Sequence, residues 1–268
     1  MSRTRGTWNT KGTWIAGIAL AAMLLLTAYA AFSGGGDDES KTGAKGGSSA
    51  NPSASGSASP EPTYAQPPDW TEPQRWTALP RGQRTDERGS QLGFPHTAEG
   101  AVAMMAAGNT TRIEGDRSNK TEQLRIYNTY IGKADQSSEA AEQIELNAIT
   151  TDKSLAKEMG VAAGQPLPSG AYVRSHVVGY QVIKQSGDEV SAWLLARVVQ
   201  KNGETSAEKG SYTRTLVGAQ WVDGDWKMTA DATARAQQET QGKAEPTMAA
   251  PGDEVFNTAG WTAIREAS

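Results

Sequence analysis

The distribution of apolar positions divides the chain into parts with different properties. A continuous apolar run is followed by a stretch without Leu, Ile, Val or Phe, and apolar side chains then return at spacings typical of helices and strands. The pattern predicts a short polar N-terminus, an apolar span, a linker, a folded domain and a tail, over residues 1–13, 14–32, 33–68, 69–231 and 232–268.

The apolar run carries no charged residue from Trp14 to Phe32. Its 19 residues, at about 1.5 Å of helix per residue, come close to the ~30 Å hydrocarbon core of a bilayer. Basic residues precede the run and acidic residues follow it, namely Arg3, Arg5, Lys11, Asp37, Asp38 and Glu39. The positive-inside bias then places residues 1–13 in the cytoplasm. We therefore expect a single-pass protein of the cell membrane with an extracytoplasmic C-terminal domain.

A cleaved signal peptide is the alternative interpretation of the same segment. Ala28-Tyr29-Ala30 has the small-x-small pattern of a cleavage site, and the apolar residues before it have the length of a signal peptide's hydrophobic region. Cleavage after Ala30 would release the domain instead of anchoring it. Both interpretations export the C-terminal part. The chain contains no cysteine, which excludes both a lipid-modified cysteine and a disulfide framework, so an ordinary hydrophobic core must stabilise the domain.

Residues 33–68 have the composition of a disordered linker. Gly, Ser and Pro make up 20 of these 36 residues, so the segment cannot bury enough apolar surface to offset the entropy of ordering it. As a Gly/Ser-rich coil it would span roughly 30–35 Å. It holds the domain off the membrane, either as a spacer through an envelope layer or as a solvating tether.

Three helical blocks precede the strands. Thr97 is a suitable N-cap for a helix over 98–107, and His96 just before it is interpreted as part of a docking turn with Phe94 and Pro95. Further helices are predicted over 120–131 and from Ser138 as N-cap, and a short separate helix is predicted to restart at Thr151 or Asp152 and to end at Gly160 in a Schellman motif.

After Pro168 the sequence changes to strand-forming residues. Long runs rich in Val, Tyr, Trp and Leu occupy 171–184, 189–201 and 212–223. Asp223-Gly224, between Trp221-Val222 and Trp226-Lys227-Met228, favours a tight primed hairpin turn. These features predict an antiparallel sheet of at least four strands. Helices first and strands second indicate the α+β class, with the helices covering one sheet face.

This order of elements, ending in the hairpin Gln220-Trp221-Val222-Asp223-Gly224-Asp225-Trp226-Lys227-Met228, resembles the nuclear-transport-factor-2-like cone fold. With a cytoplasmic segment, one span and a linker, the chain resembles the bitopic assembly components of type IV secretion and conjugation machines, including those of Gram-positive bacteria. It is also similar to uncharacterised membrane-anchored proteins of high-GC Gram-positive bacteria. The resemblance implies helices packed on a curved antiparallel sheet that encloses a cone-like cavity.

Tyr172, His176 and Tyr180 share one parity along their strand, so all three are candidates to line that cavity. Some enzymes of this fold place an Asp or His base and a Tyr donor there. Arg174 has the same parity, however, so this face is equally interpreted as solvated or partner-facing. Two histidines and no cysteine argue against a zinc site. We expect no catalytic residue, no cofactor and no metal.

Two function classes follow from the sequence. The first is a non-enzymatic scaffold or assembly subunit of a conjugation or secretion apparatus, whose partners are the membrane, other envelope or secretion-system proteins and a possible second copy. Trp193, Tyr212 and Trp226 are its candidate aromatic anchors, on the expectation that they are exposed. The second class is an anchored or secreted ligand-binding or sensory module. Residues 69–268 are mildly acidic, which does not favour nucleic-acid binding.

The tail over 232–268 begins with a helix-like stretch and then becomes polar. Phe256, Trp261 and Ile264 bring apolar side chains back near its end. They form a short recognition segment that docks either on this domain or on a partner.

Overall fold

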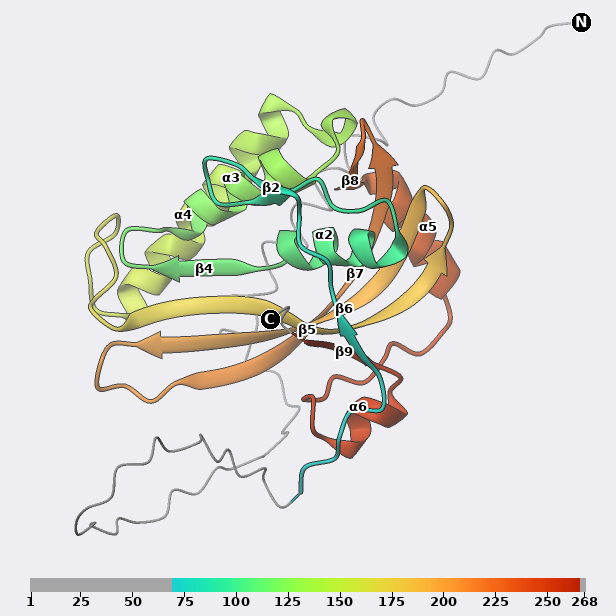
Figure 1. Ribbon diagram of the computed structural model, residues 1–268. Coiled ribbons are helices and arrows are strands. Elements are labelled where there is room, and N and C mark those ends of the chain that lie inside the picture. Colours follow the sequence, from blue (N-terminus) through green and yellow to red (C-terminus); the bar gives the residue numbers. More distant parts are fainter. Residues whose placement is uncertain (1–68, 266–268) are drawn as a thin grey trace, which may run out of the picture.

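The computed structural model describes residues 69–265 (Figure 1). The predictions for residues 1–13, 14–32 and 33–68 lie outside this range. Within it, we find no helix with the length and apolar character needed to cross a bilayer.

In the described part, one seven-stranded sheet and one two-stranded sheet accompany five α-helices and a 3-10 helix. In chain order the elements are β1 (Trp76–Ala78), β2 (Arg84–Thr85), β3 (Gln91–Leu92), α2 (Ala98–Gly108), β4 (Thr111–Glu114), α3 (Asn119–Tyr130), the 3-10 helix η1 (Lys133–Asp135), α4 (Ser138–Glu158), β5 (Ala171–Gln185), β6 (Glu189–Asn202), β7 (Lys209–Val222), β8 (Asp225–Met228), α5 (Ala230–Thr240), α6 (Glu254–Thr258) and β9 (Thr262–Arg265).

The main sheet has seven strands, of which six follow the order β1-β9-β5-β6-β7-β8 while β4 pairs with β5. The meander from β5 to β8 is antiparallel, which confirms the four predicted strands. The sheet as a whole is mixed, because β1 and β9 pair in parallel. The expectation of a wholly antiparallel sheet is wrong for this reason: the tail returns to the sheet as a strand beside β5.

Side-chain caps start the helices where the sequence indicates. Thr97 accepts a hydrogen bond from the Gly100 amide, as predicted, and Ser137 instead of Ser138 caps α4. The predicted restart at Thr151 is wrong, since α4 is one continuous helix whose Thr151 hydroxyl donates to the Asn147 carbonyl.

The end of α4 is the predicted Schellman motif. The Val161 amide donates to the Ala156 carbonyl at 2.9 Å, and Gly160 has a φ of +73°.

Helices cover both faces of the sheet, so the expectation of a single covered face is wrong. The main hydrophobic core unites α2, α3 and α4 with side chains such as Ala219, Leu194 and Val217. Gly218 points to the opposite face, where an added Cβ would collide with the backbone of Ala232 in α5. A glycine at this position therefore lets α5 lie directly on the strand.

The described part of the tail belongs to the domain. Phe256 and Trp261 are fully buried and pack with Leu195 on the sheet face opposite the main core. The Trp261 Nε1 donates to the Thr247 carbonyl at 2.7 Å. Of the two alternatives for this segment, the structure therefore shows docking on its own domain. The expected boundary between domain and tail, after residue 231, falls inside α5.

A buried carboxylate fastens the last hairpin to the segment before α2. Asp223 and Gly224 both have positive φ, of +54° and +79°, which confirms the primed turn. Just after it, the Asp225 carboxylate accepts hydrogen bonds from the amides of Gly93, Phe94 and Trp226, at 3.1, 3.2 and 2.9 Å. The hairpin is thus joined to residues more than 130 positions earlier.

Asp225→Ala is expected to lower the free energy of unfolding by about 2–4 kcal/mol, because buried amide groups lose their acceptor. The measurement is chemical denaturation of the full chain followed by tryptophan fluorescence. The control is Glu87→Ala, which changes an exposed acidic residue and should stay within about 0.5 kcal/mol of the parent. Equal effects of the two substitutions would contradict the role given to Asp225.

Candidate functional site

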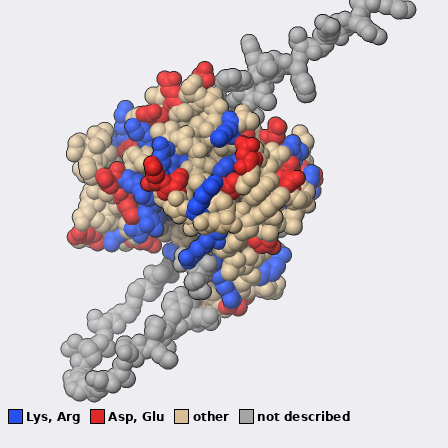
Figure 2. Space-filling model, turned by 45° about the horizontal axis from the view of Figure 1, so that its top comes forward, with Lys and Arg blue, Asp and Glu red and all other residues tan. Residues whose placement is uncertain are grey.

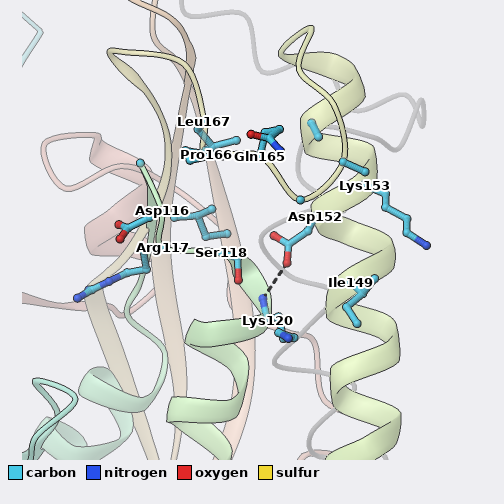
Figure 3. Close-up of a pocket in the computed structure, with 15 residues that line it drawn as sticks. Asp116, Arg117, Ser118, Lys120, Ile149, Asp152, Lys153, Gln165, Pro166 and Leu167 are labelled. Carbon is cyan, nitrogen blue, oxygen red and sulfur yellow. Dashed lines mark hydrogen bonds between the residues drawn. The ribbon is translucent and has the colours of Figure 1, made fainter.

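The structure contains an open pocket of about 500 Å³ between α3, α4 and two loops (Figure 3). Its walls come from the loop that joins β4 to α3, from the C-terminal half of α4, and from the loop over 163–167. The volume lies in the range of small-molecule sites.

Backbone hydrogen bonds hold the two loops in place. The amide of Glu114 donates to the Arg117 carbonyl at 3.2 Å, which closes the turn at Gly115, where φ is +58°. The Leu167 amide donates to the Gly115 carbonyl at 2.9 Å. The pocket wall is therefore formed by two loops that are tied to each other.

Asp152 on α4 connects the two helices that flank the pocket. Its Oδ1 accepts the Asn119 amide at 2.7 Å and its Oδ2 accepts the Lys120 amide at 3.0 Å, so the carboxylate caps the first turn of α3. Burial raises the pKa of Asp152, and the two backbone hydrogen bonds oppose that rise without cancelling it.

The basic side chains around the pocket are directed elsewhere. The Lys120 Nζ lies 3.4 Å from Glu145 Oε1, and Arg117 lies 3.8 Å from a carboxylate oxygen of the buried Glu122. Figure 3 shows Lys153 on the outer side of α4 and Arg117 directed away from Asp152. The charged group that points into the pocket in this view is the Asp152 carboxylate.

The three predicted cavity residues do not line one cavity. Tyr172 and His176 lie on the sheet face opposite the main core, whereas Tyr180 is buried in that core and donates to Thr77 Oγ1 at 3.0 Å. The reason is a register shift in β5 between Val177 and Gly179, which reverses the alternation of faces.

The predicted aromatic anchors are also placed differently. Trp226 is fully buried, and its Nε1 donates to the Pro95 carbonyl at 2.9 Å, so the expectation that it is exposed is wrong. Trp193 and Tyr212 are half-buried and pack against the C-terminal cluster around Trp261. The C-terminal segment of the same domain therefore covers the side chains that were expected to bind a partner.

His96 brings together three segments that are distant in the sequence. Its ring stacks on Trp221 at 4.0 Å with an interplanar angle of 12°, and its Nε2 lies 2.9 Å from Asp188 Oδ1. Trp226 meets both rings edge-on. The docking turn before α2 thus packs against the β7–β8 hairpin and the β5–β6 turn. These contacts give His96 a structural role.

A network of aromatic and charged side chains occupies the end of the sheet where β5 begins. The Arg174 guanidinium lies 4.1 Å from the centre of the Tyr172 ring and also pairs with Glu114. The Tyr172 hydroxyl donates to Glu208, which raises the pKa of Tyr172, and Arg197 lies 3.6 Å from Glu208. We call Tyr172, Arg174, His176 and Arg197 the open sheet end.

Charges of both signs are intermixed on the domain. Figure 2 shows Lys and Arg side chains beside Asp and Glu side chains over the face it presents. Among residues 69–265 no group of three or more His, Asp or Glu side chains is arranged to hold a metal ion.

Comparison with known proteins gives no relative for this chain. No protein-family model, no curated protein and no solved structure matches it.

Trp226→Ala is expected to lower the free energy of unfolding by about 3–5 kcal/mol, because it empties a large part of the core and leaves the Pro95 carbonyl without its donor. Tyr172→Ala, on the open sheet end, should change it by less than about 1 kcal/mol. Thermal or chemical unfolding of both variants is the measurement. A Trp226→Ala protein as stable as the parent would contradict the buried position of the indole.

Proposed function

We propose that the protein is a non-enzymatic, membrane-anchored extracytoplasmic component of the cell envelope, and that it serves as a scaffold or assembly subunit of a conjugation or secretion apparatus. The apolar segment over 14–32, the linker over 33–68 and the α+β domain after them support this proposal through their order. The proposal includes the cone-like architecture of the family that the sequence resembles.

The observation that carries the proposal is the open sheet end. On this sheet face, α5 covers the strands near Gly218 and the C-terminal cluster covers them near Leu195. Beyond these two covers the face carries tyrosine and arginine side chains, which are enriched at protein interfaces. Tyr172, Arg174 and Arg197 therefore replace Trp226 as the candidate anchors for a partner.

The first described residues lie away from this surface. The Thr71 amide donates to the Gly252 carbonyl at 2.7 Å, so the described chain starts against the C-terminal segment. Figure 1 shows that start beside α6, well apart from the end of the sheet where β5 begins. A partner on the open sheet end would therefore not contact the first described residues.

The pocket favours a second candidate function, an anchored or released ligand-binding or sensory module. Its volume of about 500 Å³ suits a small molecule or a short peptide segment. The two functions use different surfaces of the domain and are therefore tested separately.

A photo-crosslinking residue in place of Arg197 is expected to capture subunits of a conjugation or secretion apparatus in intact membranes, identified by mass spectrometry. The paired substitution Tyr172→Ala and Arg197→Ala should reduce recovery of those subunits roughly tenfold or more, because interface tyrosines and arginines contribute strongly to binding.

The matched control places the same crosslinker at Glu142, an exposed position on α4. Equal capture from Arg197 and Glu142, or recovery that the paired substitution leaves unchanged, would remove the open sheet end as the partner surface. Capture of a second copy of the chain would instead establish a homo-oligomer.

A further inference from the structure

We propose that the pocket between α3 and α4 binds a primary ammonium group carried on a short aliphatic chain, with Asp152 as the residue that receives the ammonium. This inference rests on the second proposed function and names its ligand chemistry. The same chemistry occurs in a lysine side chain of a peptide and in a free alkyl amine.

The first argument concerns which charge the pocket favours. A helix N-terminus ordinarily attracts an anion, because its first amide groups lack partners. At α3 the amides of Asn119 and Lys120 already donate to Asp152, and the Ser118 hydroxyl accepts the Thr121 amide. A ligand at this point therefore meets a carboxylate and not free amide groups.

The second argument concerns the hydrogen bonds that this carboxylate can still accept. Each oxygen of Asp152 accepts one backbone hydrogen bond and keeps a further lone pair. Lys120 pairs with Glu145 and Arg117 pairs with Glu122. The charge of Lys120 also opposes the rise in the pKa of Asp152, but within residues 69–265 no Lys or Arg side chain forms a direct ion pair with this carboxylate. An ammonium group supplies the cationic donor that this half-buried carboxylate lacks.

The third argument concerns the rest of the pocket. Ile113 and Ala156 are buried beneath it, and Ile149 and Leu167 contribute partly exposed aliphatic side chains to its walls. These side chains suit a stem of methylene groups. The volume exceeds that of a butylammonium ion, so space remains for the backbone of a peptide beside the polar rim at Ser118 and Gln165.

The test is a titration of the full-length protein in detergent micelles, labelled with ¹⁵N-glycine. The probes are N-acetyl-lysine methylamide, its uncharged norleucine counterpart, its glutamate counterpart and n-butylammonium chloride. We expect the lysine probe to shift the amide signals of Gly115 and Gly164 at concentrations up to about 10 mM, and to bind at least about tenfold more tightly than the norleucine probe.

Substitutions distinguish the loss of the Asp152 carboxylate from a disturbance of the fold. Asp152→Asn should reduce the affinity for the lysine probe about tenfold or more. Because this change also touches the cap of α3, Ile149→Lys provides a second test that keeps the carboxylate and adds a repelling charge to the wall. Lys157→Ala, which removes an exposed lysine of α4 that does not line the pocket, is the matched control and should leave the affinity unchanged.

The outcomes separate this inference from the function on which it rests. Binding of the lysine probe alone supports a peptide ligand, and equal binding of n-butylammonium supports a free amine. Equal or tighter binding of the norleucine or glutamate probe overturns the ammonium chemistry while leaving a ligand-binding pocket. Absence of any shift at Gly115 and Gly164 with all four probes overturns the inference, and the crosslinking result at the open sheet end stays independent of it.

Discussion

The register shift in β5 between Val177 and Gly179 governs the architecture of the domain. On one edge of β5, β4 pairs before the shift and β9 pairs directly after it, so the shift divides that edge between two strands. It also reverses the faces, which turns Tyr180 into the core and leaves Tyr172 outside. Gly179 allows a close approach there, because an added Cβ would lie 3.2 Å from the Phe256 ring, which would have to shift by a few tenths of an ångström. The register shift thus marks the point on β5 where β9 pairs and places Tyr172 and Tyr180 on opposite faces.

The sequence predicted the features that depend on local chemistry. The Thr97 cap, the Gly160 helix end and the Asp223-Gly224 turn depend on residues within a few positions, and the structure has all three. Three strands of the meander were predicted because their runs are long and rich in strand-forming residues, and the short β8 was predicted from the Asp223-Gly224 turn before it. The break at Thr151 was a wrong prediction, since propensity is weak and the packing of α4 on α3 outweighs it.

Features that depend on distant pairings were not predictable from the pattern. The parallel pairing of β1 with β9 joins residues such as Trp76 and Ala263, and nothing local in either segment indicates it. The strict alternation of side chains along a strand places Tyr172 and Tyr180 on one face. One extra residue in β5, between Val177 and Gly179, puts them on opposite faces. The pocket has the same origin: Gly115, Asp152 and Leu167 come from three separate segments, and only the fold brings them together.

The place of β9 in the sheet has a mechanical consequence. A pull on residue 69 reaches the domain through the contact of Trp70 with Gly252 and through β1, which is hydrogen-bonded to β9. Since β9 stands between β1 and β5, a pulling force on this edge reaches β5 through β9, which is the last strand of the described residues. The C-terminal segment is therefore the force-bearing link between the first described residues, from residue 69 to β1, and the rest of the sheet.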